Sequence, residues 1–254
     1  MIHLLEVSKT FGTGASALTD ITLSIDKGEF VFLVGPSGSG KTSLLRLLIR
    51  EMVPTKGTIT LNNVDIGNLP NSKIPQLRKQ IGVVFQDLKM LMDRTIYENI
   101  LLPLEMSGMD HGEAAKKVAD ILRQVGISDH TEKFPIQLSG GELQRAAIAR
   151  ALVFSPAIIL ADEPTGNLDN TTSWEIVKLL QDINKSGTTV IMATHNQEIV
   201  ASLAKRTIML EKGKIVHDDK QSTGHSEKEE KHHKKEEQVP DDPEPKNGEK
   251  NEDK

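Results

Sequence analysis

The feature that most constrains the fold is the stretch GPSGSGKT at positions 35–42. It fits the pattern G-x-x-x-x-G-K-[ST] at every fixed position, and such loops bind phosphate through converging backbone N–H groups. The apolar run FVFLV precedes it at 30–34, and the apolar spacing of TSLLRLLIREM at 42–52 predicts a helix after it. A strand, a phosphate loop and a helix in this order predict a nucleoside-triphosphate site.

The loop supplies the first candidate binding residues. We expect Lys41 to reach the β- and γ-phosphates and the Thr42 hydroxyl to bind Mg²⁺. A chance glycine-rich turn is the alternative, but the strand and helix on either side argue against it. The expected nucleotide-binding set here is Gly35, Pro36, Ser37, Gly38, Ser39, Gly40, Lys41, Thr42 and Ser43.

Three apolar runs end in side chains that suit catalysis. AIILADEP at 157–164 predicts a buried strand that ends at Asp162, which would hold Mg²⁺ through water, and Glu163 would polarise the attacking water. The alternative for this acidic pair is a helix cap. Gln86 and His195 also end apolar runs, at the edge where parallel sheets bind ligands. Gln86 is a candidate Mg²⁺ contact or an exposed strand end, and His195 is a candidate site residue or an ordinary core or surface histidine.

A second anion-binding pattern lies at LSGGELQRAAIARAL, positions 138–152. A serine and two glycines open a run of strong helix formers, and a helix N-terminus favours an anion through its free N–H groups and its dipole. The chain therefore carries two such helix starts.

The remaining pattern alternates strands with helices, which predicts an α/β fold with a mainly parallel, doubly wound sheet. TITLNNVDI at 58–66 predicts antiparallel strands joined by a turn at 62–63, and residues 88–152 form a mostly helical insert. Within that insert the pattern of 111–126 predicts a helix that ends on Gly126.

The net charge of the chain is confined to its end. Residues 218–254 contain 13 acidic and 8 basic side chains, a net −5, whereas residues 1–217 are neutral. The tail has almost no apolar side chains, so we expect it to be disordered, with one domain over 1–217. The neutral domain argues against a nucleic-acid partner. The chain has no cysteine, no apparent secretory signal and no apolar run near the ~20 residues of a membrane span, so we expect a soluble cytoplasmic protein.

Over about residues 1–217, these motifs together resemble the ATP-binding subunit of an ATP-binding cassette (ABC) transporter. The parts occur in the family's order: Phe11, GPSGSGKT, Gln86, LSGGE at 138–142, ILADEP at 159–164, GNLD at 166–169 and His195. The resemblance implies a P-loop NTPase core of the RecA-like kind, with an N-terminal antiparallel β-subdomain and the helical insert. It also implies hydrolysis of ATP with Mg²⁺ as the cofactor.

The resemblance further implies a head-to-tail homodimer that shares its nucleotides. In the family, the signature stretch of one subunit meets the γ-phosphate bound by the other. The roles it implies are Phe11 stacking on adenine, Ser139, Gly140, Gly141 and Glu142 at the partner's ATP, Asp169 at the dimer seam, and His195 as a switch beside Glu163.

Residues 74–108 and 190–195 are most similar to the cell-division branch of this family, and the alternative is a lipoprotein-release or efflux branch. This implies an integral membrane partner, a peripheral position on the cytoplasmic face of the membrane, and control of cell-wall hydrolysis. Family members contact their partner with the segment equivalent to 87–105. Its apolar residues fit a docking surface and the core of the insert equally well: Leu88, Met90, Leu91 and Met92.

Other ATPase and GTPase classes fit less well. Only 95 residues separate Thr42 from Leu138, with no heptad array, which excludes the long coiled coil of DNA-maintenance ATPases. Zinc-bearing repair cassettes need cysteine, translation factors of this kind carry two cassettes, and the base-reading motif of GTPases is missing.

Overall fold

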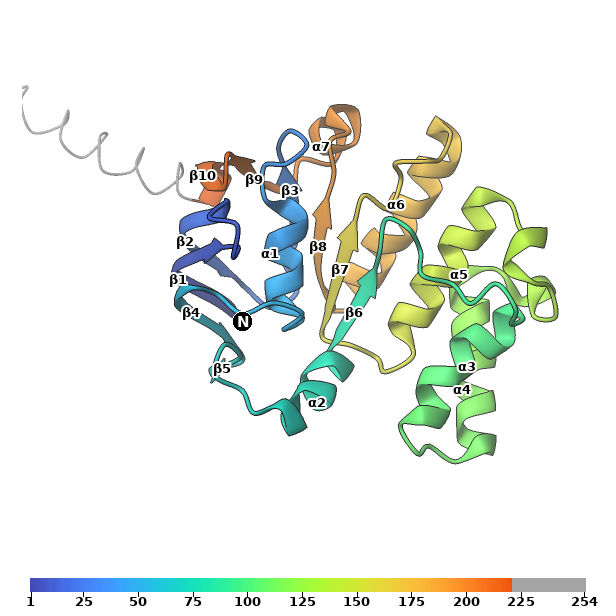
Figure 1. The fold of residues 1–254 in the computed structure, drawn as a ribbon. Helices are drawn as coiled ribbons and strands as arrows, with labels where there is room; N and C mark the ends of the chain where they lie inside the picture. Colours follow the sequence, from blue (N-terminus) through green and yellow to red (C-terminus); the bar gives the residue numbers. More distant parts are fainter. Residues whose placement is uncertain (221–254) are drawn as a thin grey trace, which may run out of the picture. The chain divides into compact units, whose positions relative to one another are not determined.

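The computed structural model describes residues 1–220, and Met1–Asp219 form one unit (Figure 1). The tail predicted to be disordered lies outside the described residues from position 221 onward. Within the described part, no helix is both long enough and apolar enough to cross a membrane.

The central element is a six-stranded sheet in the order β10-β9-β3-β8-β7-β6. Only β10 is antiparallel to its neighbour, so the mainly parallel sheet expected from the sequence is confirmed. Every residue of β7 and β8 is buried, as expected for strands covered on both faces. The strands are β3 (Phe30–Val34), β6 (Ile81–Val84), β7 (Ile158–Asp162), β8 (Thr189–Ala193), β9 (Arg206–Glu211) and β10 (Lys214–Asp218).

A second sheet of four antiparallel strands has the order β2-β1-β4-β5. Its strands are β1 (Ile2–Thr10), β2 (Ser16–Ile25), β4 (Lys56–Leu61) and β5 (Val64–Asp65). The turn between β4 and β5 has positive φ at Asn62 and Asn63, 49° and 64°, as a tight hairpin turn requires. Helix α1 (Lys41–Leu48) packs between the two sheets, because its leucines share one apolar core with both (Figure 1).

The other helices are α2 (Ile74–Lys79), α3 (Ile96–Met106), α4 (His111–Val125), α5 (Gly140–Leu152), α6 (Asn170–Lys185) and α7 (Gln197–Leu203). Short 3₁₀ turns lie at Asn71–Lys73, Ser128–His130 and Pro135–Gln137. Helix α4 ends at Gly126 in the left-handed conformation, φ 74°, as predicted.

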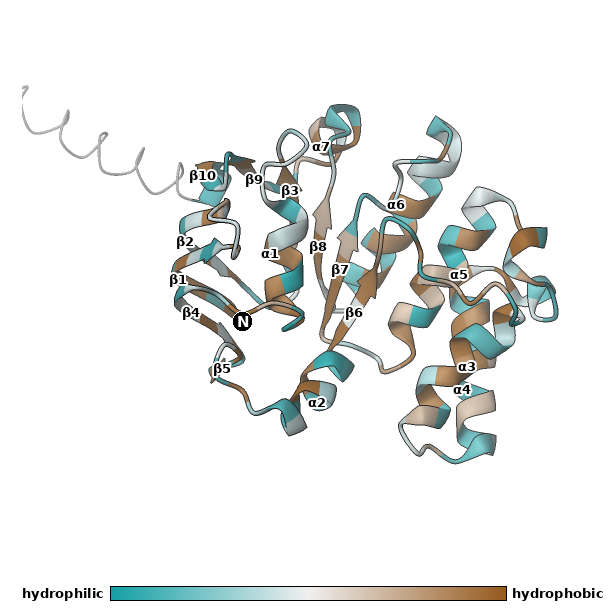
Figure 2. Cartoon of the chain, viewed as in Figure 1, coloured by the Kyte–Doolittle hydropathy of each residue, from teal (hydrophilic) through white to brown (hydrophobic). Residues whose placement is uncertain are grey.

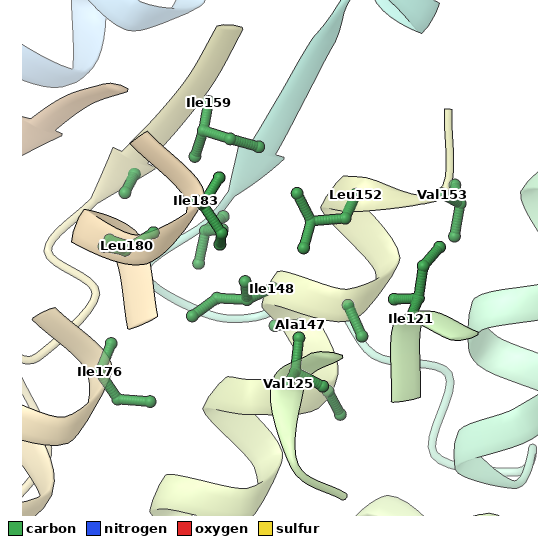
Figure 3. Close-up of a cluster of buried hydrophobic side chains, with 14 of the residues drawn as sticks. Ile121, Val125, Ala147, Ile148, Leu152, Val153, Ile159, Ile176, Leu180 and Ile183 are labelled. Carbon is green, nitrogen blue, oxygen red and sulfur yellow. The ribbon is translucent and has the colours of Figure 1, made fainter. Parts of the chain in front are cut away.

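Helix α5 connects the helical insert to the sheet. Figure 3 shows Ile148 and Leu152 of α5 in one buried cluster with Ile159 of β7 and Leu180 of α6. The same cluster extends to α4, so α5 has apolar neighbours on several sides. The hydropathy pattern agrees, since apolar residues dominate β6, β7 and β8 and polar ones gather on the outer surfaces (Figure 2).

Four local expectations differ from the structure. The helix predicted over 42–52 ends at Leu48, because Arg50 takes a φ of 56° and its Nε donates to the Ile66 carbonyl at 2.8 Å. The strand predicted to reach Gln86 ends at Val84, and α7 was not predicted. The boundary placed before Asp218 is too early, because the unit extends to Asp219 and Asp218 ends β10, where its buried carboxylate binds Arg206.

Candidate nucleotide site

A cavity of about 690 Å³ lies above the phosphate loop. It brings together side chains from five separate segments of the chain. Its lining consists of Phe11, Ala15, Ser16, Ala17, residues 37–43, Gln86, Asp162, Glu163, Gly166 and His195. The cavity therefore brings together the expected loop residues 37–43, the two carboxylates, Gln86, His195 and Phe11, whereas Gly35 and Pro36 do not line it.

The loop conformation requires its glycines. Gly35 has a φ of 146°, and a Cβ there would lie 2.1 Å from the Leu210 carbonyl oxygen. Gly40 has a φ of 109° directly before α1, where a Cβ would approach the Ala17 carbonyl oxygen to 2.8 Å. Backbone of β2 and β9 thus packs against the loop too closely for any side chain, which holds the loop N–H groups in place.

Two polar groups of the loop suit a phosphate. Lys41 is buried, and its Nζ donates to the carbonyl oxygens of Gly35 at 2.7 Å and Pro36 at 3.1 Å. An ammonium group has three donors, so one is left for an anion. The Ser39 hydroxyl is buried and has no hydrogen-bond partner among the described residues. A bound phosphate would satisfy this orphaned group.

The oxygen ligands expected for Mg²⁺ lie in the same cavity. Asp162 ends β7, and its side chain accepts a hydrogen bond from Thr42. Burial raises the pKa of the Asp162 carboxyl, and the charge of Glu163 adds to this, against the opposing effects of Thr42, Lys41 and Arg46. No cluster of three or more histidine, cysteine or carboxylate side chains exists in the described part. Mg²⁺ is commonly held by few protein ligands and takes the others from phosphate and water. The oxygens of Thr42, Asp162 and Gln86 fit such a site.

Glu163 and His195 form a pair at the edge of the cavity. His195 Nδ1 lies 2.9 Å from Glu163 Oε2, and the glutamate side chain is 12% exposed against 71% for the histidine. The backbone of Glu163 is left-handed, with a φ of 49°, and its N–H donates to the Ala193 carbonyl at 3.0 Å. Strained residues of this kind concentrate at functional sites. A carboxylate fixed at the cavity rim is positioned to accept a proton from water.

The signature residues form a second group, none of which lines the cavity. Ser139 caps α5: its N–H and its hydroxyl each donate to Glu142 Oε2 at 2.7 Å. The backbone N–H of Ser139, then its hydroxyl, lowers the pKa of the Glu142 carboxyl, and His130 contributes from 3.0 Å. Ser139 and Gly140 are exposed, so this helix N-terminus faces outward.

Asp169 belongs to this second group. It caps α6 by accepting from the Thr172 hydroxyl at 2.5 Å and from the Thr172 N–H at 2.9 Å, and these contacts, the hydroxyl first, lower the pKa of the Asp169 carboxyl. A Cβ on Gly141 would lie 2.5 Å from the Thr172 side chain, so the signature helix packs directly against the start of α6. The structure thus divides the candidate residues between two places on one chain.

Some lining and supporting residues were missed by sequence reasoning. Gly166 lies shortly after Glu163, and this nearness is a signal that could have placed it at the cavity. Ser16 and Ala17 carry no such signal, because only the packing of β2 against the loop brings them there. His130 likewise meets Glu142 only through the tertiary fold.

Comparison with known proteins identifies the family. Residues 18–166 match the ABC transporter family. The chain is 48% identical over 219 residues to the cell division ATP-binding protein FtsE of Bacillus subtilis, covering 86% of this chain and 96% of that protein. It is 44% identical over 215 residues to FtsE of Escherichia coli, covering 85% and 97%.

A solved structure gives the same answer for the fold. The dimeric structure of a post-hydrolysis state of the ATP-binding cassette MJ0796 bound to ADP and Pi matches with a TM-score of 0.78 and 36% identity, over 86% of this chain and 98% of that one. The fold and the site are thus those of an ATP-binding cassette. The chain belongs to the ABC transporter family, and the resemblance seen in its motifs is confirmed.

Proposed function

We propose that this chain is the Mg²⁺-dependent ATPase subunit of an FtsE-like complex that acts in bacterial cell division. Its similarity to proteins named as cell division ATP-binding proteins supports this branch over lipoprotein release or efflux. The observation that carries the ATPase activity is the Glu163–His195 pair at 2.9 Å beside the phosphate loop.

The candidate site residues of the cavity each have a proposed role. The loop N–H groups and Lys41 bind the phosphates, and the exposed ring of Phe11 stacks on the base. Thr42, Asp162 and Gln86 hold Mg²⁺, which when bound neutralises phosphate charge. Glu163 holds the attacking water and accepts its proton at a carboxylate oxygen, while His195 orients that carboxylate through Nδ1.

We propose that the signature group completes the site of a second copy of the chain. Ser139 and Gly140 are exposed and do not line the cavity of their own chain. A helix N-terminus with a capping serine offers N–H groups to an anion. The similar cassette MJ0796 is described as a dimer bound to ADP and Pi, which supports a head-to-tail homodimer with ATP between the subunits.

The proposed membrane partner is an FtsX-like integral protein, which would hold this chain at the cytoplasmic face of the membrane and pass the ATP cycle to cell-wall hydrolases. Residues 87–105 are the proposed contact. Leu88 and Met90 pack against the main core, whereas Leu91 and Met92 are 40% and 57% exposed. The docking role therefore falls on Leu91 and Met92.

The shared site is tested by mixing two inactive variants. Glu163→Gln and Ser139→Arg should each abolish ATP hydrolysis and retain ATP binding. In a mixed dimer, the loop of the Ser139→Arg copy faces the intact signature of the other copy, so one complete site forms. Random pairing makes half of the dimers mixed, so the mixture should recover about a quarter of the parent activity.

Two results would contradict this scheme. Parent-level hydrolysis by Glu163→Gln would exclude the proposed base, and no recovery on mixing would exclude the shared site.

The proposed contact with the membrane partner is tested separately. The double substitution Leu91→Asp with Met92→Asp should abolish co-purification with the membrane protein. Val216→Asp, at a side chain 52% exposed on β10, is the matched control and should leave it intact.

A further inference from the structure

Arg150 links the signature helix to the segment that follows Gln86. It lies in the last turn of α5, and its guanidinium donates to two consecutive carbonyl oxygens. Nη2 donates to the Leu88 oxygen and Nη1 to the Lys89 oxygen, both at 2.5 Å. A planar guanidinium presents its donors as a rigid fork, so one side chain fixes two adjacent peptide groups.

Both of these peptide groups belong to residues in a disfavoured conformation. Leu88 and Lys89 have φ values of 57° and 53°, in the left-handed region that non-glycine residues seldom adopt. Two such residues in succession need support from their surroundings. The local bonds are the Leu88 N–H to the Phe85 carbonyl at 3.0 Å and the Lys89 N–H to the Asp87 carbonyl at 2.6 Å.

The Arg150 side chain is half-buried. Burial lowers the pKa of Arg150, yet a guanidinium keeps its charge in proteins. In residues 1–220, the structure records no carboxylate partner for it, only the two carbonyl oxygens. A buried charge is costly unless it is well hydrogen-bonded. The two carbonyl contacts are therefore what keeps Arg150 in place, and Arg150 in turn keeps the loop in place.

The far end of the same loop is held by Asn99 of α3, which is buried. Its Oδ1 accepts from the Leu91 N–H at 2.8 Å, and its Nδ2 donates to carbonyl oxygens of Leu91, Arg94 and Thr95 at 2.9, 3.2 and 2.9 Å. The loop between β6 and α3 is thus fixed at two points. Gln86 lies between the end of β6 and the first of these points, with its side chain on the nucleotide cavity.

We propose that Arg150 is a positioning residue for Gln86. By holding Leu88 and Lys89 in the left-handed conformation, it sets the direction in which the chain leaves Gln86, and hence where the Gln86 amide lies in the cavity. Because Arg150 and Ser139 sit on one helix, the same contact ties the placement of Gln86 to the signature. This inference rests on the proposed ATPase function.

The first test is a kinetic double-mutant cycle with Arg150→Lys, which replaces the two nitrogens that reach Leu88 and Lys89 by a single nitrogen on a shorter side chain. We expect kcat for ATP hydrolysis to fall about tenfold while KM changes less than about twofold, because the phosphate loop, not Gln86, dominates ATP binding. In a Gln86→Ala background, Arg150→Lys should cause no further loss. If Arg150→Lys lowers kcat by the same factor in both backgrounds, the proposal is overturned, because a merely structural role of Arg150 predicts that the two losses multiply.

The second test measures hydrogen exchange of the loop directly and does not depend on activity. It adds Arg150→Met, a variant that can be too unstable for kinetics. Deuterium uptake at 86–90 should rise in Arg150→Met and in Arg150→Lys. The control is Arg145→Lys on the same helix, whose guanidinium donates to the Val125 carbonyl and to Glu175. It should leave uptake at 86–90 and kcat unchanged. Unaltered uptake in both Arg150 variants would overturn the proposal, whereas failure of the ATPase scheme is read separately from Glu163→Gln.

Discussion

Gly82 of β6 lies against the backbone of the signature helix, and Gly82→Ala should measure how tight that contact is. A Cβ at this position would lie 2.3 Å from the carbonyl oxygen of Ala151 on α5 and 2.6 Å from Ile159 Cδ1 on β7. The isoleucine methyl can rotate away, but the carbonyl belongs to helix backbone. The substitution therefore acts on the spacing between α5 and β6.

The size of the effect follows from these distances. Real Cβ atoms essentially never come within 3.0 Å of such neighbours, so α5 and β6 must separate by about 0.7 Å. Overpacking of a core costs about 1–3 kcal/mol, and a clash with backbone belongs near the upper end. For a domain of this size, about 2–3 kcal/mol lowers Tm by about 4–12 °C.

The assay is thermal unfolding, with urea unfolding as a check on the free energy. The matched control is Gly12→Ala, because a Cβ there meets nothing within 4 Å and the residue does not need a positive φ. We expect the control to change stability by less than about 0.5 kcal/mol. If Gly82→Ala is as stable as Gly12→Ala, the α5–β6 contact is looser than the structure indicates and this reasoning is refuted.

Two further substitutions test buried charges. Arg206 is 9% exposed and binds Glu29 and Asp218; burial alone would lower its pKa, but these two carboxylates raise it above its usual value. Arg206→Met should destabilise the fold by about 3–5 kcal/mol in urea unfolding, and Arg206→Lys by less; equal stability of Met and parent would contradict this. The raised pKa of Asp162 means that the folded state binds this proton more tightly than the unfolded state, so its ionisation opposes folding as pH rises above the ordinary value of 3.8. Asp162→Asn should therefore have a higher Tm than the parent at pH 7, and the difference in Tm should grow as pH rises above 3.8. A lower Tm of the variant at pH 7 would refute this.

Most of the fold could be predicted because its signals are local. Continuous apolar runs predicted β7 and β8, and Gly126 predicted the end of α4. The motif at 35–42 predicted the positions of β3 and α1, since the backbone path of such a loop needs glycine at Gly35 and Gly40. The candidate site residues came from positions at strand ends, where parallel topology brings them together.

The remainder depends on contacts between residues distant in sequence. Composition alone assigned Asp218 to the tail, because nothing near it shows that Arg206 lies across the β9–β10 hairpin. The end of α1 depends on Arg50 reaching Ile66, and the conformation of Leu88 depends on Arg150 from another helix. The spacing of apolar residues, with a period of two in strands and 3.6 in helices, does not indicate such contacts.

Helix α5 carries a functional contact at each end, which constrains how the proposed dimer can work. Ser139 at its start faces outward to the site proposed for the partner's phosphate, and Arg150 in its last turn holds the loop beside Gln86. A short helix is stiff, and Gly82 leaves no slack between its last turns and β6. We therefore expect a displacement at Ser139 to tilt α5 about this contact, and the hydrogen bond of Arg150 to pass that tilt to Leu88. In the proposed dimer, docking of a nucleotide on one chain and placement of Gln86 in the other chain's cavity would then be coupled, and a substitution at Gly82 or Arg150 should weaken this coupling without removing either site.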